Sequence, residues 1–173
     1  MILSTLELTF FRNYVHEAIS FDGKKNIFIG KNAQGKTNLL EAIYLLSISR
    51  SFRTRHEREA INFTNNFFTI KGEFYLDNGN SKKVIFHCTQ EEGKQISIDR
   101  KKINKLSDYI GQFPIVLSSP EEYSLTLGPP SERRRFFDIL LSQIGIKYIH
   151  NLQDYYRIVK QRNKILSDKN FSN

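Results

Sequence analysis

The stretch of sequence that decides the fold reads Gly30-Lys31-Asn32-Ala33-Gln34-Gly35-Lys36-Thr37. It matches G-x-x-x-x-G-K-[ST], the pattern of a phosphate-binding P-loop. An apolar run at 26–29 precedes it and a helical apolar pattern at 36–47 follows it, so we predict a buried central strand, the loop and a buried helix, in that order. A chance match in a chain of this length has a probability of about one in a hundred. The pattern therefore predicts binding of ATP or a close relative, rather than a glycine-rich turn without a ligand.

The residue types in this loop fit the chemistry of a triphosphate with Mg²⁺. Gly30 and Gly35 permit backbone conformations that a side chain would forbid, so successive N–H groups can converge on phosphate oxygens. Lys36 is expected to reach the β- and γ-phosphates, and the Thr37 hydroxyl is expected to bind Mg²⁺. The positive end of the helix dipole faces the same anion. We predict that all eight residues of 30–37 bind the nucleotide and that Thr37 is the metal ligand.

Outward from the loop, the sequence predicts an antiparallel layer. Residues that alternate between apolar and polar indicate strands, and turn residues separate them. The expected strands cover 2–10, 18–21, 67–76 and 83–89, and residues 95–103 are expected to form another hairpin. After a short helix at 106–110, an apolar strand is expected at 114–117.

A helical pattern fills the last part of the chain. Residues 132–166 are expected to be helical with a break near Gly145, and Ser131 is expected to cap the first helix. We therefore predict an α/β fold with a nucleotide-binding lobe at 1–130 and the start of a helical lobe at 131–173.

Composition and charge limit the classes of protein that fit. The 173 residues carry a net charge of +8, so the surface attracts polyanions such as nucleic acid without identifying one. The single cysteine, Cys88, excludes an internal disulfide framework, and the histidines lack metal-ligand spacing, so no structural metal is expected. Apolar runs are too short to span a membrane and no secretory signal is visible, which predicts a cytoplasmic protein.

Two basic clusters could contact DNA phosphates, because lysine and arginine on loops provide contacts that do not depend on base sequence. The first cluster is Arg50, Arg53, Arg55 and Arg58, and the second is Lys94, Arg100, Lys101, Lys102 and Lys105. Solvated surface is the simpler interpretation of either cluster. As candidate DNA contacts we name Arg50, Arg53, Arg55, Lys101 and Lys102.

Two groups of residues in the predicted helical region at the end of the chain also lead to predictions. At least one of the three consecutive arginines at 133–135 is expected to pair with a carboxylate or to lie at a lobe junction. Tyr148, Tyr155 and Tyr156 are spaced for helical packing rather than for stacking on bases.

Hydrolysis needs a carboxylate at the end of a second buried strand, where it holds Mg²⁺. No run of four aliphatic residues ends in two acidic residues. The apolar run at 115–117 continues into Ser118-Ser119-Pro120, and Asp138 lies in a predicted helix. We expect this chain to bind ATP without hydrolysing it on its own, and we name no catalytic residue.

Several further motifs together resemble the bacterial RecF family over residues 6–166. They are Leu6-Glu7-Leu8, Phe11-Arg12-Asn13-Tyr14, Thr37-Asn38-Leu39-Leu40-Glu41-Ala42-Ile43-Tyr44, Arg50-Ser51-Phe52-Arg53-Thr54, Ser119-Pro120-Glu121-Glu122, Gly128-Pro129-Pro130, Arg133-Arg134-Arg135-Phe136-Phe137-Asp138, Tyr155-Tyr156-Arg157 and Lys160-Gln161-Arg162-Asn163. The resemblance implies a P-loop ATPase head of the ABC and SMC type. It also implies that Arg12 and Asn32 lie near the nucleotide. Ala33 stands where the wider group of ABC-type loops often has glycine.

By this resemblance the protein would act in DNA replication, recombination and repair. Such heads form homodimers around two ATP molecules, bind single-stranded or gapped DNA, and work with recombination mediator proteins to load recombinase in gap repair and the SOS response. Their signature motif and their Mg²⁺-binding carboxylates lie in a C-terminal segment that this chain does not contain. The resemblance therefore implies an N-terminal fragment of a weak ATPase.

Two alternatives from other classes stay open. One is a P-loop kinase that phosphorylates a small metabolite, and the other is a protein-interaction module in which the nucleotide is only structural. Kinases of that class place the loop after the first strand and continue with parallel βα units, whereas about 29 residues of apparent antiparallel structure precede the loop here.

Overall fold

The structure is a computed structural model that describes residues 1–118 and 128–167. The motif at 119–122 lies outside the described residues. Packing divides the chain into two units, Met1–Leu106 and Ser107–Asn173. The first unit ends well before the lobe boundary predicted after residue 130, and that boundary stays a prediction.

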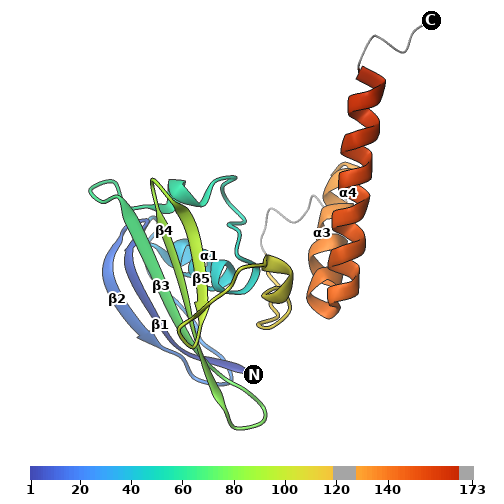
Figure 1. Cartoon of the computed structure of the whole chain (residues 1–173). Helices are drawn as coiled ribbons and strands as arrows, with labels where there is room; N and C mark the ends of the chain where they lie inside the picture. Colours follow the sequence, from blue (N-terminus) through green and yellow to red (C-terminus); the bar gives the residue numbers. More distant parts are fainter. Residues whose placement is uncertain (119–127, 168–173) are drawn as a thin grey trace, which may run out of the picture. The chain divides into compact units, whose positions relative to one another are not determined.

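A six-stranded antiparallel sheet forms the first unit (Figure 1). Its strands are β1 (Ile2–Phe11), β2 (Tyr14–Ser20), β3 (Phe67–Tyr75), β4 (Ser81–Thr89), β5 (Gly93–Ile98) and β6 (Lys101–Lys102), in the spatial order β2-β1-β3-β4-β5-β6. All neighbouring pairs are antiparallel, and turns join all of them except β1 and β3. The predicted antiparallel layer is therefore confirmed, and β2 begins four residues earlier than expected.

Helix α1 (Lys36–Ile48) covers one face of this sheet (Figure 1). Alternation along the strands turns the apolar side chains toward the helix, and the core of the unit contains Leu6, Leu8, Leu45, Leu46, Phe68, Ile70, Val84 and Phe86. Gly72 of β3 allows the close approach, because a Cβ atom there would lie 2.6 Å from the Leu46 Cδ1 atom. The 3₁₀ helix η1 (Glu57–Ala60) lies between α1 and β3 in the chain.

The strand predicted at 26–29 is not formed. These residues are irregular, and Ile27 and Ile29 are 70% and 92% exposed. An apolar run indicates that burial is favourable, but a strand also needs a neighbour to accept and donate its backbone hydrogen bonds. Among the described residues no strand pairs with this segment.

The strand predicted at 114–117 is also absent, and a side chain takes the place of a neighbouring strand. The Gln143 amide accepts a hydrogen bond from the Ile115 N–H group at 2.8 Å and donates one to the Ile115 carbonyl at 3.1 Å. Val116 is 74% exposed. The apolar pattern could not reveal this pairing, because it depends on a residue 28 positions away.

Two helices, α3 (Pro130–Ile144) and α4 (Ile146–Ser167), lie side by side in the second unit (Figure 1). The predicted break at Gly145 is confirmed. Helix α3 begins with Pro130 in its first turn and Pro129 in the capping position, so the prediction that Ser131 caps the helix is wrong. The short 3₁₀ helix η2 (Leu106–Asp108) stands where a helix was expected at 106–110.

Asp138 joins the two helices through tyrosine hydroxyls. Its carboxylate accepts hydrogen bonds from Tyr148 at 2.7 Å and from Tyr156 at 3.3 Å. Tyr148 is half-buried, as expected for packing, but Tyr155 and Tyr156 are 60% and 56% exposed, so the packing prediction is wrong for those two. None of the arginines at 133–135 forms an ion pair with another described residue, and a lobe junction at this position stays a prediction.

Cys88 is shielded on β4, where the side chain is 1% exposed. Burial, with a smaller contribution from the charge of Glu57, raises the pKa of the thiol from its ordinary value near 9 to about 11. We expect the native chain at pH 8 to react with a thiol reagent about a hundredfold or more slowly than the urea-unfolded chain. Absorbance of the released chromophore measures both rates, and equal rates would contradict the prediction.

The raised pKa of Cys88 also makes the stability of the folded chain depend on pH. The unfolded thiol ionises near pH 9 and the folded thiol near pH 11, so the folded state holds the proton more tightly. This contribution to stability is complete below pH 9 and is lost as the pH rises toward 11.

No described helix combines the length and the apolar character needed to cross a membrane.

Candidate nucleotide-binding site

The P-loop leaves the segment at 26–29 and turns into α1, whose first residue is Lys36. Two residues of the turn have positive φ, Ala33 at 65° and Gly35 at 103°. The sequence assigned this conformational freedom to Gly30 and Gly35. Gly35 does require it, but Gly30 has no positive φ, and a Cβ atom there would meet nothing within 4 Å. Ala33 instead takes the second left-handed position, which explains why glycine is common there in similar loops.

Replacing each of the two glycines by alanine is therefore expected to change the free energy of unfolding by a different amount. Gly35→Ala places a methyl group at a positive φ and 2.9 Å from the side chains of Asn13 and Tyr14, so we expect the free energy of unfolding to fall by about 1–3 kcal/mol. Gly30→Ala is the matched control and is expected to change it by less than about 0.5 kcal/mol. Urea denaturation measures both, and equal effects would contradict the assignment.

Lys36 reaches back across the loop. Its Nζ atom donates hydrogen bonds to the carbonyl oxygens of Gly30 and Lys31, each at 2.7 Å. The first turn of α1 contains no acidic residue, so the positive end of the helix is not compensated there. The Lys36 ammonium group and the N–H groups of the helix start both lie at this point, and together they fit an anionic ligand.

The remaining loop residues face solvent. Lys31, Asn32, Ala33 and Gln34 are exposed. Thr37 is exposed as well, and within the described part of the chain its hydroxyl makes no hydrogen bond. A free hydroxyl next to a phosphate-binding loop is suited to be a ligand of the Mg²⁺ in a nucleotide complex. The described residues contain no group of three or more His, Cys, Asp or Glu side chains that could hold a metal by themselves.

Arg12 makes a buried ion pair rather than a free surface charge. Its Nε and Nη2 atoms donate to the Glu41 carboxylate at 3.0 and 2.7 Å, and its Nη1 atom donates to the Glu59 carbonyl at 2.9 Å. Glu41 is fully buried in the second turn of α1. The pair fixes the β1–β2 turn to the helix that follows the P-loop. That Arg12 also lies near a bound nucleotide stays a prediction.

Glu41 was not among the predicted site residues. The signal was present, because Glu41 is the one charged residue within the apolar stretch at 39–46. Ser51 also donates to its carboxylate, at 2.5 Å, and Arg53 does so at 3.3 Å. The partners come from segments 10 to 29 residues away in sequence, and periodicity contains no information about them.

The predicted DNA contacts divide into two kinds. Arg53 donates to Asn38 at 2.5 Å and contacts Glu41, so its side chain, 41% exposed, is held on α1. Arg50, Arg55, Lys101 and Lys102 are exposed, and none of them forms an ion pair with a described residue.

Other members of the basic clusters have structural roles. Lys94 donates to the Ser49 carbonyl at 2.7 Å and pairs with Glu57 at 2.9 Å. Arg58 donates to the Glu91 carbonyl at 3.1 Å. These two cations stabilise the unit and contribute less to a free positive surface than the sequence suggested.

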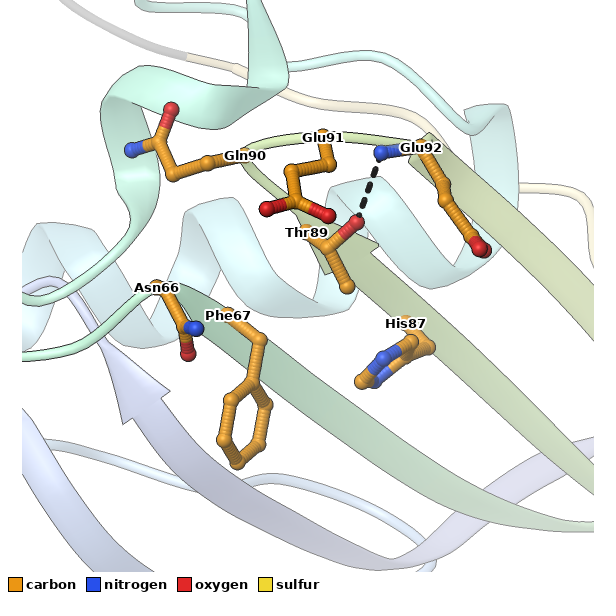
Figure 2. A pocket seen from close by; sticks show the side chains of 7 residues that line it. All are labelled: Asn66, Phe67, His87, Thr89, Gln90, Glu91 and Glu92. Atoms are coloured by element: carbon orange, nitrogen blue, oxygen red, sulfur yellow. Dashed lines mark hydrogen bonds between the residues drawn. The ribbon is translucent and has the colours of Figure 1, made fainter.

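A separate cavity of about 470 Å³ opens at the other end of the β3–β4 hairpin from its turn. Figure 2 shows its lining residues, which are Asn66, Phe67, His87, Thr89, Gln90, Glu91 and Glu92. None of them belongs to the P-loop. The cavity has two carboxylates and no lysine or arginine in its lining, so it does not suit a phosphate group.

Comparison with known proteins agrees with this geometry. Residues 1–127 match the family model described as the AAA ATPase domain. The chain belongs to this AAA ATPase domain family. The DNA replication and repair protein RecF of Ligilactobacillus salivarius is 42% identical over 168 residues, which are 97% of this chain and 44% of that protein. RecF of Bacillus mycoides is 40% identical over 166 residues, which are 96% of this chain and 44% of that protein.

Solved structures give the same result for this AAA ATPase domain. The recombination mediator protein RecF with ATP superposes with a TM-score of 0.91 at 32% identity, over 99% of this chain and 46% of that one. A structure from a study of SMC ATPases gives a TM-score of 0.64 at 17% identity, which shows the fold alone. The predicted fold class and the resemblance to RecF are both confirmed. The chain spans less than half the length of the curated relatives it matches.

Proposed function

We propose that this chain binds Mg-ATP at residues 30–37 and is the ATP-binding part of a RecF-type protein of DNA replication and repair. The observation that carries the proposal is the combination of a complete P-loop at the start of α1 with a TM-score of 0.91 to RecF with ATP. In this proposal Lys36 binds the β- and γ-phosphates, Thr37 binds Mg²⁺, and the remaining residues of 30–37 supply backbone N–H groups. Arg12 and Asn32 lie near the nucleotide.

Isothermal titration calorimetry of the folded chain with Mg-ATP tests this directly. We expect measurable heat and a single binding site, and no comparable heat with adenosine, because the phosphates supply most of the contacts. Absence of heat from well-folded protein would overturn the proposal.

The proposal extends to DNA repair in a cytoplasmic setting. The relatives support an ATPase of DNA replication and repair, and we add four more specific functions to the proposal. These are binding of single-stranded or gapped DNA, recombinase loading with recombination mediator proteins, a role in the SOS response, and an ATP-dependent homodimer. Negligible ATP turnover by this chain alone is also proposed, because no described strand ends in the acidic pair that hydrolysis requires.

The exposed lysines of β6 provide a test of DNA binding. Replacing both Lys101 and Lys102 by alanine should weaken DNA retention in a mobility-shift assay and lower the slope of log affinity against log salt by up to about 2, since each phosphate contact contributes about 0.9. Replacing the exposed Lys24 and Lys25 removes the same charge elsewhere. An equal effect of the two double variants would mean that only net charge acts.

A metabolite kinase is the rival from another class. The antiparallel sheet on both sides of the loop in sequence argues against it, because kinases of that class continue with parallel βα units. Release of ADP that depends on a candidate metabolite would favour the rival.

A further inference from the structure

The turn between β1 and β2 lies directly against the P-loop. Asn13 donates a hydrogen bond from Nδ2 to the Gln34 carbonyl at 3.4 Å, and the Tyr14 hydroxyl donates one to the Gly35 carbonyl at 3.2 Å. A Cβ atom at Gly35 would lie 2.9 Å from both side chains. The turn therefore contacts the last two peptide units before the helix, at the point where the loop becomes α1.

These two contacts help to orient the neighbouring N–H groups, and the Gly35 carbonyl also accepts the first hydrogen bond of α1, from the Leu39 N–H group at 2.9 Å. In a trans peptide unit the carbonyl and the following N–H group point in opposite directions. Holding the Gln34 carbonyl therefore orients the Gly35 N–H group, and holding the Gly35 carbonyl orients the Lys36 N–H group. Both N–H groups stand at the start of α1, where the helix offers them no carbonyl partner and an anion can accept their hydrogen bonds.

The turn itself is held firmly. The Arg12 N–H group donates to the Ala60 carbonyl at 2.8 Å, and Asn62 donates to the Arg12 carbonyl at 2.8 Å. Together with the Arg12–Glu41 ion pair, these contacts fix the turn to η1 and to α1. A fixed support can hold the loop in one geometry before a ligand arrives.

The side chains of the turn are held in the same way. The Asn13 Oδ1 atom accepts a hydrogen bond from Asn38 at 2.7 Å, which leaves its amide N–H to face the Gln34 carbonyl. Desolvation, with a smaller contribution from the charge of Glu17, raises the pKa of Tyr14 above its ordinary value, so the hydroxyl keeps its proton to a higher pH than an exposed tyrosine does.

We propose that Asn13 and Tyr14 are positioning residues that aim the Gly35 and Lys36 N–H groups at the phosphates of the bound nucleotide. The inference rests on the proposed ATP binding and adds two residues outside the P-loop to it. Neither side chain needs to touch the nucleotide, because each acts through a backbone carbonyl of the loop.

The test compares Tyr14→Phe, Asn13→Ala and the double variant by calorimetry, with Mg-ATP and with Mg-tripolyphosphate as probes. Each single variant should weaken binding of both probes by about two- to tenfold, the range that one hydrogen bond contributes, and the double variant should weaken it further. Urea denaturation is run alongside, and we expect the unfolding midpoint of Tyr14→Phe to stay close to that of the unmodified chain. Tyr75→Phe removes an exposed hydroxyl from β3 and should change neither measurement.

Each alternative outcome has a distinct meaning. If the unmodified chain binds neither probe, the proposed function itself fails. If it binds both probes and the variants bind them equally well, only the positioning role fails. The positioning role is also overturned if the variants lose affinity for Mg-ATP but not for tripolyphosphate, or if the unmodified chain binds Mg-ATP but not tripolyphosphate. It is likewise overturned if the stability of the variants falls in proportion to their affinity. Those results would assign Tyr14 and Asn13 to the base or ribose, or to the fold.

Discussion

Replacing Lys36 by alanine is expected to weaken Mg-ATP binding by about ten- to a hundredfold while the chain stays folded. The Lys36 ammonium group donates hydrogen bonds to the Gly30 and Lys31 carbonyls, both at 2.7 Å. A nucleotide offers it phosphate oxygens in their place, and a hydrogen bond to a charged group contributes about 1.5–3 kcal/mol. The folded state loses less, because these two bonds lie at an accessible site where water can replace Lys36.

Calorimetry with Mg-ATP and urea denaturation together check this prediction. The matched control is Lys25→Ala, which removes the same charge from an exposed position before the loop. We expect the control to bind Mg-ATP with an affinity within about twofold of the unmodified chain, since exposed charges are screened by salt. A folded Lys36→Ala variant with unchanged affinity would remove the basis for assigning the site.

Replacing Glu41 by alanine should have the largest effect on stability, with a loss of about 3–5 kcal/mol. The carboxylate is fully buried and accepts hydrogen bonds from Arg12, Ser51 and Arg53. Its removal leaves the Arg12 guanidinium, whose side chain is only 17% exposed, without its charged partner. Removing one member of a buried pair costs more than the pair contributed, because the remaining charge is not solvated.

Urea denaturation of two further variants distinguishes the loss of the Glu41 charge from the loss of its side-chain volume. Glu41→Gln keeps the volume and one acceptor oxygen, so we expect a smaller loss than for alanine. Glu17→Ala removes an exposed carboxylate from β2 and should change the free energy of unfolding by less than about 0.5 kcal/mol. A loss below about 1 kcal/mol for Glu41→Ala would show that water reaches Arg12 and that the ion pair does not hold the turn.

Local sequence signals predicted the elements whose structure is determined locally. The P-loop and the start of α1 follow from glycine, lysine and helical periodicity, and the break at Gly145 follows from one residue. The hairpins of the sheet follow from alternation and turn residues, because their partners are adjacent in sequence.

Features that depend on distant partners could not be predicted in this way. The residues at 26–29 are apolar enough for a strand, yet strand formation requires a neighbour that periodicity cannot supply. Arg12 and Glu41 are 29 positions apart, and the Asn13 and Tyr14 contacts with the loop span 21. The sequence showed that these residues are unusual, but only the fold showed which ones meet.

The exposed apolar segment at 26–29 has a practical consequence for handling the chain in solution. Within the described part of the chain its backbone pairs with no strand, so the segment and its isoleucines form an edge to which a second molecule can add a strand, a common beginning of precipitation. The net charge of +8 opposes this association at low salt, and added salt removes the repulsion. Concentrated stocks should therefore be kept at low ionic strength.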